Sequence, residues 1–443
     1  MSSFGSRCNR HRMLKVIASA CVFLGCVSCY SQQPTQNYQM SSDKKAIDVD
    51  LKGLHVRLGT PVEVTAQIGW RVSTFNFDRW AFTHLTPTLG KFPNGELIAT
   101  YTLDPDTQAN PYFLSGFQIS KDHGEHWGTR FAMLIQHIPM TFIPAANDSL
   151  IALPSEMLGD REGNQNLHGP YVKFEHGGDS VIVQPDGVRV VDWPWPVSEN
   201  HSSQPESNWH YSLLMSGDAI RVHGKILATA YWHRKGDKYF GNGLLSSDDE
   251  GHTWHYYSTI ATDADMPAET RATKGYGGPD EISMIRLAEG ELMAVFRVGN
   301  GTEGKLWRSY SKDDGRTWSK PDQLPAYCVQ PRVVQIANGT IVIASGRPGI
   351  GLWFSTDPRG RSWQYIDLAA VHNKFMSDPS YRILPTKPDH PENIWWQTTS
   401  YTGLVEIANN RLLLVYDRDP EGAPSGPNDL SRLFAMPIEI LRK

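Results

Sequence analysis

The chain has 443 residues, with 38 glycines, 29 prolines and 11% aromatic residues. This composition is typical of an all-β protein that is rich in turns. The formal net charge is −5, and no basic run lies outside the extreme N-terminus, so nucleic acid is not expected as a partner.

The N-terminus predicts an export signal. Four basic residues between positions 7 and 15 precede an apolar stretch over residues 16–25, which is too short to span a membrane. Cys26 or Cys29 would be the lipid-carrying cysteine of a bacterial lipoprotein, and plain secretion with cleavage nearby is the alternative. We therefore expect a periplasmic, outer-membrane or secreted protein.

The predicted organisation is a leader over residues 1–29, a polar tether over residues 30–47 and one folded domain over residues 48–443. Only Cys328 of the five cysteines lies in that domain, so no disulfide framework is expected. No spacing of cysteine and histidine suggests structural zinc. We expect no metal or other cofactor, and a monomer whose only membrane contact is the N-terminal lipid.

Four copies of the phrase S-x-D-x-G-x-T-W recur along the domain. They cover residues 120–127, 247–254, 311–318 and, with one inserted residue, 355–363. The aspartate accepts backbone N–H groups inside a tight turn, the glycine supplies a positive φ, and the tryptophan packs under the turn. We call these segments the Asp phrases and predict that they stabilise the fold and do not contact substrate.

A second repeat consists of two apolar runs joined by a short turn. Such turns between β-rich runs predict hairpins. They stand at Asn94-Gly95, Asn147-Asp148, His223-Gly224, Glu289-Gly290, Asn338-Gly339 and Asn409-Asn410. Six hairpins, with Asp phrases after four of them, predict a six-bladed β-propeller of four-stranded antiparallel blades. A pair of β-sandwiches is the alternative.

Two polar residues hold equivalent places in two of these hairpins. Glu281 lies nine residues before Gly290, and Tyr401 lies nine residues before Asn410. The inner strands of a propeller begin at its central funnel, so we expect both side chains to face the central axis.

The Asp phrases and the text around these two residues resemble the sialidase (neuraminidase) superfamily over roughly residues 80–440. Gly278-Pro279-Asp280-Glu281 resembles the strand that carries the catalytic glutamate of that family, and the segment 401–417 resembles the strand pair that carries its nucleophilic tyrosine. Arg297 and Arg347 stand at the places of the second and third arginines.

The resemblance implies a retaining glycosidase that removes a terminal acidic sugar. The carboxylate on the anomeric carbon of a sialic acid would repel a carboxylate nucleophile, whereas the neutral phenol of Tyr401, with Glu281 as its base, avoids that repulsion. A separate acid protonates the leaving oxygen, and Asp104 and Asp106 are both candidates. Arg297 and Arg347 would grip the substrate carboxylate.

One departure bears on the substrate. His84 falls near the place where sialidases have their first arginine. A histidine at this place would suit a uronic acid as the substrate, or would act as an acid or a base near neutral pH. The two long insertions, over residues 155–215 and 255–280, carry aromatic residues suited to sugar binding, and Tyr276 is our candidate there.

Two other functions therefore stay open. One is a uronate-directed lyase on the same scaffold, with His84, His168 or His210 as the base. The other is a propeller that binds a glycan without turning it over. Each candidate residue also has a purely structural alternative, such as an ordinary axial contact or a loop turn.

Overall fold

The computed structural model describes residues 38–443 with gaps. The undescribed segments are 66–70, 75–76, 81–85, 103–111, 129–130, 137–138, 160–166, 196–210, 235–236, 274, 300–303, 328, 348, 384–397 and 419–430. Residues 38–443 form one compact unit. Within the described residues, none of the helices is both long and apolar enough to cross a membrane.

Strands form nearly all of the regular structure, mostly in sheets of four or more strands. One sheet has the order β10-β9-β8-β7. Its strands are β7 (Thr88–Lys91), β8 (Leu97–Thr102), β9 (Tyr112–Ser120) and β10 (Phe131–Gln136). A second has the order β20-β21-β22-β23. Its strands are β20 (Pro279–Arg286), β21 (Leu292–Val298), β22 (Lys305–Ser311) and β23 (Asp322–Gln323).

The third four-stranded sheet has the order β24-β25-β26-β27. Its strands are β24 (Val329–Gln335), β25 (Ile341–Gly346), β26 (Ile350–Ser355) and β27 (Gln364–Asp367). Short helices and one separate hairpin lie outside the sheets. They are α1 (Ala268–Arg271), α2 (Leu368–Phe375), the 3-10 turns η1 (His176–Gly178), η2 (Asp263–Asp265) and η4 (Pro379–Tyr381), and the hairpin of β5 (Arg71–Thr74) and β6 (Phe77–Trp80).

A seven-stranded sheet joins both ends of the described chain. It consists of β1 (Gln39–Met40), β2 (Ala46–Leu51), β3 (Leu54–Gly59), β4 (Val62–Glu63), β28 (Thr402–Ala408), β29 (Arg411–Arg418) and β30 (Arg432–Arg442). β3 pairs with β30, with Leu54 opposite Arg442, so the N-terminal strands extend a sheet that the C-terminal strands build.

The nine-stranded sheet contains two of the predicted hairpins. Its strands are β11 (Pro139–Ala145), β12 (Ser149–Pro154), β13 (Glu156–Gly159), β14 (Leu167–Glu175), β15 (Ser180–Val191), β16 (Tyr211–Val222), β17 (Lys225–Trp232), β18 (Gly241–Ser247) and β19 (Thr253–Ala261). The short strand β13 pairs with both β14 and β16 and thereby joins what would otherwise be two sheets.

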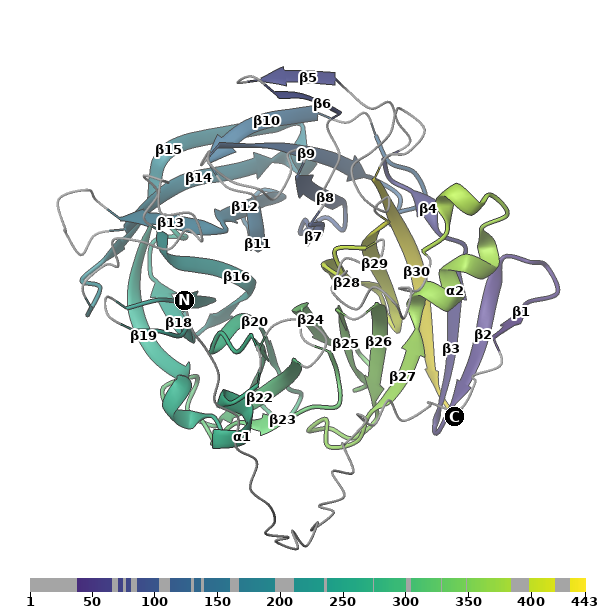
Figure 1. Ribbon diagram of the computed structural model, residues 1–443. Helices are drawn as coiled ribbons and strands as arrows, with labels where there is room; N and C mark the ends of the chain where they lie inside the picture. Colours follow the sequence, from purple (N-terminus) through teal and green to yellow (C-terminus); the bar gives the residue numbers. More distant parts are fainter. Residues whose placement is uncertain are drawn as a thin grey trace, which may run out of the picture. The chain divides into compact units, whose positions relative to one another are not determined.

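The inner strands β7, β11, β16, β20, β24 and β28 surround a common centre (Figure 1). Each contacts the next, and β28 contacts β7. All six predicted hairpins are present, and the all-β prediction is confirmed. The number of separate blades stays a prediction, because β13 merges two of them into one sheet.

The folded unit begins earlier than predicted. We expected a tether up to residue 47, but the compact unit starts at Tyr38 and β2 starts at Ala46. The reason is packing: Ile47 is fully buried, and the Tyr38 hydroxyl accepts the backbone N–H of Asp367 at 2.9 Å. These contacts fix a segment whose polar composition resembles a linker.

The Asp phrases have the structural role that was predicted. In all four, an aspartate Oδ1 accepts the backbone N–H four residues later, at 2.8, 2.8, 2.9 and 3.2 Å in chain order. In the first three, the serine hydroxyl accepts the N–H of the phrase glycine. The phrase glycines have φ between 62° and 93°, a region that few other residues adopt.

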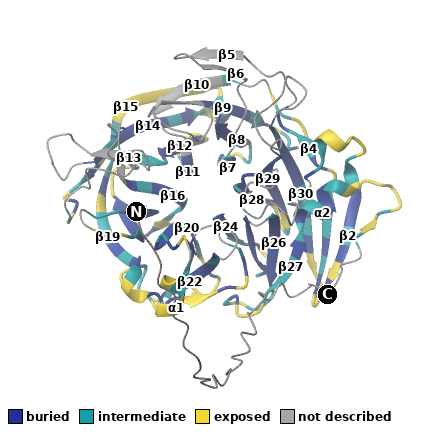
Figure 2. Ribbon diagram, viewed as in Figure 1, coloured by how far each residue is buried: buried dark blue, intermediate teal, exposed yellow. Residues whose placement is uncertain are grey.

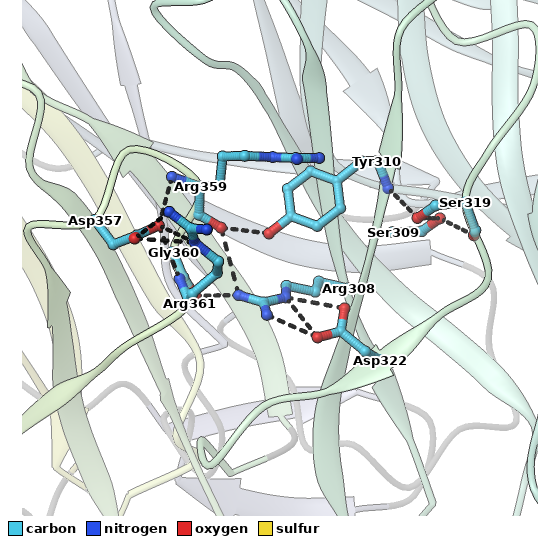
Figure 3. A network of polar contacts seen from close by, with 9 residues as sticks. All are labelled: Arg308, Ser309, Tyr310, Ser319, Asp322, Asp357, Arg359, Gly360 and Arg361. Atoms are coloured by element: carbon cyan, nitrogen blue, oxygen red, sulfur yellow. Dashed lines mark hydrogen bonds and ion pairs between the residues drawn. The ribbon is translucent and has the colours of Figure 1, made fainter.

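The fourth Asp phrase also joins two sheets (Figure 3). Arg308, on β22, donates to the carbonyl of Gly360 and forms an ion pair of 2.7 Å with Asp322. The Tyr310 hydroxyl donates to the carbonyl of Arg359. The sheet of β20–β23 is thereby fastened to the turn after β26. Most strands are buried, and exposed residues gather in loops, at the rim and along β15 (Figure 2).

The inner strands approach one another closely at Gly217 on β16. This residue has φ +89°, and a Cβ added there would stand 1.8 Å from the carbonyl oxygen of Ile282 on β20. Gly290 has a similar φ of +93°, but a Cβ there would meet nothing within 4 Å. Gly217 is therefore required by packing as well as by backbone conformation.

Gly217→Ala is expected to destabilise the protein more than Gly290→Ala, because only the first displaces β20. Backbone strain of about 1–3 kcal/mol is common to both. The clash at Gly217 adds about 1–3 kcal/mol or more. Urea unfolding of both variants measures the difference, and equal midpoints would contradict this account of the contact.

Candidate active site

Glu281 and Tyr401 meet at the centre of the inner strands. The Tyr401 hydroxyl donates a hydrogen bond to Glu281 Oε1. Glu281 Oε2 accepts from Arg297 Nη1 at 2.8 Å and from the backbone N–H of Gln330 at 2.9 Å. The glutamate is 5% exposed, whereas the tyrosine is partly exposed, so the phenol is the member of the pair that a ligand can reach.

Irregularities in two strands aim these groups at each other. The pairing of β20 with β21 shifts between Pro279 and Ile282, which places Glu281 in a bulge. The pairing of β24 with β25 shifts between Val329 and Arg332, and Gln330 within it has φ +26°. Bulges re-aim single residues out of the regular ladder. Here one bulge presents a carboxylate and the other presents the N–H that binds it.

The turn before Tyr401 is built on a buried aspartate. Asp417, on β29, accepts the Thr398 hydroxyl at 2.7 Å and the backbone N–H of Thr399 at 3.1 Å. Ser400 then has φ +66°, and its hydroxyl donates to the carbonyl of Gly349 at 2.8 Å. These bonds fix the backbone from which the Tyr401 side chain leaves.

The two arginines expected at the site lie beside the pair. Besides Glu281, Arg297 contacts the carbonyl of Gly299 at 3.1 Å through Nε. Arg347 lies over the Tyr401 ring, 5.8 Å from its centroid, and donates to the carbonyl of Thr399 at 2.9 Å. Both arginines are almost fully buried, so their charges act at close range on the glutamate and the phenol.

The protonation states follow from these contacts. Burial opposes the charge of Glu281, but Arg297 and the hydrogen bonds from Tyr401 and Gln330 together hold the pKa of Glu281 below its usual value. Burial and the Glu281 carboxylate raise the pKa of Tyr401 well above its usual value. At neutral pH the Glu281 carboxylate is therefore ionised and accepts a hydrogen bond from the neutral phenol of Tyr401. This arrangement suits a base and the nucleophile that it activates.

Two further groups surround the pair and were not singled out from the sequence. Asp280 is 9% exposed, and its Oδ2 lies 3.8 Å from Arg297 Nε. Burial and then the charge of Glu281 raise the pKa of Asp280, against the effect of Arg297. Tyr231, on β17, is partly exposed, and burial together with the charges of Glu281 and Tyr401 raises its pKa. Asp280 is adjacent to Glu281 in sequence, but no sequence signal marks Tyr231.

The remaining candidates fall elsewhere. His84, Asp104, Asp106 and His210 lie outside the described residues. Tyr276 is 9% exposed, and its ring packs against Tyr239 at 4.8 Å within an apolar cluster, which is the setting of a core residue. His168 contacts Asp186 at 2.9 Å between β14 and β15. The described contacts of Tyr276 and His168 thus do not include Glu281 or Tyr401.

No metal centre is found in the part of the chain that the structure describes, where no three His, Cys, Asp or Glu side chains are grouped to hold an ion.

Asp417 gives the turn a pH-dependent stability. Burial raises its pKa from 3.8 to about 6. Because the folded state binds this proton more tightly, the contribution of Asp417 is greatest below pH 3.8 and is lost as the pH rises through about 6. Relative to Asp417→Asn, the wild type should therefore lose about 2 kcal/mol of unfolding free energy between pH 4.5 and 7.5.

The control is Asp313→Asn in the third Asp phrase. The hydroxyl and the backbone N–H of Thr317 lower the pKa of Asp313 to about 2. Its contribution changes only below pH 4, so the difference from the wild type should stay flat between pH 4.5 and 7.5. Urea unfolding at both pH values measures both variants, and a flat difference for Asp417→Asn would refute the assignment of this carboxyl.

Part of the chain is similar to a known protein family. Residues 192–385 match the family model of the BNR repeat-like domain. Comparison with curated proteins gave no match.

Solved structures with the same BNR-type fold include proteins of known activity. A Dyadobacter fermentans protein of unknown function has a TM-score of 0.58 at 17% identity over 88% of this chain and 100% of its own. An α-L-arabinanase of Penicillium chrysogenum, complexed with arabinobiose, has 0.52 at 16% identity over 85% and 98%. The Hadza microbial sialidase Hz136 has 0.50 at 16% identity over 80% and 65%.

At these identities the likeness concerns the fold. The resemblance predicted from the sequence is confirmed at the level of the BNR-type propeller, which sialidases and arabinanases share. The Penicillium chrysogenum and Hadza microbial neighbours are glycoside hydrolases. The substrate has to be argued from the residues of this chain.

Proposed function

We propose that this protein is a glycoside hydrolase that removes a terminal acidic sugar, sialic acid or a similar one, with retention of configuration. The observation that carries the proposal is the hydrogen bond from the Tyr401 hydroxyl to an ionised Glu281. A neutral phenol reaches an anomeric carbon that bears a carboxylate without the repulsion that a carboxylate nucleophile would meet.

The proposed reaction has two steps. Tyr401 Oη attacks the anomeric carbon while Glu281 Oε1 takes the phenol proton, and the leaving oxygen receives a proton from a second acid. Water then releases the sugar from Tyr401, and the phenol regains its proton from Glu281. Asp104 and Asp106 remain the candidates for the second acid, which would activate the water in the second step.

Arg347 and Arg297 supply the positive charge that an acidic sugar requires. Arg347 lies over the Tyr401 ring and is suited to a bidentate contact with a substrate carboxylate. Arg297 acts mainly on Glu281, since its closest ionic contact is the 2.8 Å pair with that residue. A carboxylate-binding site that depends chiefly on one arginine fits a small acidic sugar, and His84 would be its second binding residue.

A neutral furanoside is the second candidate. The engagement of Arg297 with Glu281 and Gly299 leaves less of its charge for a substrate carboxylate. The Penicillium chrysogenum protein with a similar fold is an arabinanase complexed with arabinobiose. The same tyrosine and glutamate would then act on a sugar that lacks the carboxylate.

The test is the release of an aryl leaving group from a panel of aryl glycosides. The panel contains a sialoside, a glucuronide and an α-L-arabinofuranoside, with Tyr401→Phe as the control. Turnover of the sialoside or the glucuronide, lost in the variant, supports the proposal. Turnover of the arabinofuranoside alone selects the second candidate. A product from a uronate polymer that absorbs in the near ultraviolet would instead indicate a lyase.

The proposal also includes the predicted architecture and location. The six inner strands each begin a hairpin, which is consistent with six blades and with β13 as an added strand between two of them. Export with a leader at residues 1–29 would bring such an enzyme to extracellular or periplasmic glycans.

A further inference from the structure

Arg332 lies on β24 at the centre of the inner strands and is 5% exposed. Its Nη1 donates to the carbonyl of Gly217 at 2.8 Å. Its Nη2 donates to the Thr88 hydroxyl and to the carbonyl of Met140, both at 3.0 Å, and its Nε donates to the carbonyl of Thr402 at 3.2 Å. One guanidinium from β24 thus binds β16, β7, β11 and β28 (Figure 1 shows these strands around the centre).

A second set of bonds carries this contact to β20. Asp218 follows Gly217, and its Oδ2 accepts the Ser283 hydroxyl and the backbone N–H of Met284, the latter at 3.3 Å. The Ser283 hydroxyl oxygen in turn accepts the backbone N–H of Val333 at 3.1 Å. The positive charge of Arg332 also counters the effect of burial on the pKa of Asp218. Arg332 and Asp218 together therefore hold β20, β24 and β28 in one arrangement.

Three of the residues in these bonds lie within two positions of a residue of the candidate active site. Thr402, whose carbonyl accepts from Arg332, follows Tyr401. Gln330, whose N–H binds Glu281, precedes Arg332 by two residues on β24. Ser283 follows Glu281 by two residues on β20. The nucleophile, the base and the amide that orients the base are thus attached to one buried cation through very short stretches of backbone.

The chemistry of the side chain explains why arginine stands there. A guanidinium has five N–H donors in a rigid planar fork, whereas an ammonium group has three donors at one point. Four acceptors that come from four strands can be bound together only by the larger, planar group. A lysine would keep the charge and lose most of the bonds.

We propose that Arg332 is a positioning residue, which holds Tyr401, Glu281 and the Gln330 amide at the mutual distances that the reaction requires. This inference rests on the proposed function, since it assigns a role in that reaction. It differs from a general stabilising role because it requires the geometry of the pair to change when the guanidinium is lost.

Arg308 is the matched control for a stabilising role. It is 7% exposed, donates to Asp322 and Gly360, and fastens two sheets together, but its contacts lie among the outer strands and turns (Figure 3). Arg308→Lys and Arg332→Lys are therefore comparable losses of a buried fork, and only the second is attached to the site.

The experiment compares both variants with the wild type in two ways. The first is the NMR resonance of the Tyr401 phenolic carbon in protein labelled at tyrosine Cζ, assigned with Tyr401→Phe. The second is kcat and KM for the aryl glycoside that the wild type turns over. We expect Arg332→Lys to move the Tyr401 resonance and to lower kcat about 10- to 100-fold, because small misplacements of reacting groups cost that much. KM should change less than about threefold.

Arg308→Lys should lower the thermal midpoint and leave the Tyr401 resonance and kcat unchanged. The inference is overturned if Arg332→Lys behaves in the same way. If the wild type turns over none of the glycosides but the resonance still moves in Arg332→Lys alone, the proposed function is wrong and the positioning contact stands. If the wild type is active and Arg332→Lys changes neither the Tyr401 resonance nor kcat, the positioning inference is overturned and the proposed function stands.

A milder pair of variants covers the case in which Arg332→Lys does not fold. Ser283→Ala removes one hydroxyl of the connection to β20, and Ser309→Ala removes a hydroxyl on β22 that donates to the Ser319 carbonyl at 2.5 Å. Both serines are fully buried. Ser283→Ala should move the Tyr401 resonance and lower kcat, and Ser309→Ala should do neither. Identical behaviour of the two variants would overturn the inference.

Discussion

Replacement of Tyr401 by phenylalanine is expected to lower kcat by about 10³-fold or more, as the loss of a nucleophile does in other enzymes with covalent intermediates. The substitution removes one oxygen, which is the atom bonded to Glu281. The ring and its contact with Arg347 remain, so the fold and substrate binding should change little. Steady-state kinetics on the best glycoside of the panel, with circular dichroism to verify the fold, provides the measurement.

Tyr231→Phe is the control for this prediction. Tyr231 is a neighbouring phenol whose pKa is raised by burial and by the charge of Glu281, but it has no described hydrogen bond to that residue. Its loss should cost far less activity. Glu281→Gln should be as damaging as Tyr401→Phe, because the amide accepts a hydrogen bond but no proton. Turnover that survives both Tyr401→Phe and Glu281→Gln would refute the mechanism.

Removal of the charge of Arg297 is expected to destabilise the protein strongly. Arg297→Met leaves the Glu281 carboxylate buried without its closest cation, and breaking such a buried pair costs about 3–5 kcal/mol. Since Arg297 also holds the pKa of Glu281 below its usual value, that pKa should rise. The acidic limb of the activity profile should therefore move to higher pH. Urea unfolding and a pH profile of kcat measure the two effects.

Arg361→Met is the control for the charge itself. Arg361 pairs with Asp357 at 2.8 Å, but its side chain is 68% exposed. Exposed pairs contribute little because water screens them. The unfolding midpoint and the pH profile should therefore stay near those of the wild type. Similar losses in Arg297→Met and Arg361→Met, or an acidic limb that does not move, would contradict the burial argument.

Local signals in the sequence predicted most of the scaffold. The hairpin turns were found because residues such as Gly95, Gly290 and Gly339 adopt positive φ where few other residues can. The Asp phrases were found because their hydrogen bonds join residues only four apart. Counting back from the turns also selected Glu281 and Tyr401, which the structure brings into contact.

Long-range contacts explain what the sequence did not reveal. Arg332 binds oxygens on four strands that are up to 244 residues away in sequence, so nothing near it in the chain marks its role. β13 joins two hairpins through pairings with strands on either side of it. Residues 38–47 were predicted to be part of a tether, but Tyr38 contacts Asp367, 329 residues away in sequence, and Ile47 lies in an apolar cluster that includes residues of β29 and β30. Tyr276 was selected for its aromatic loop, but its ring packs in an apolar cluster.

Identification of the labelled residue in a trapped glycosyl-enzyme tests the central claim most directly. The protein is incubated with a fluorinated glycoside of the class that it turns over, digested, and analysed by mass spectrometry for the peptide that carries the sugar. The account predicts an adduct on Tyr401 that is absent in Tyr401→Phe. An adduct on Glu281, or inversion of the product with no adduct, would contradict it.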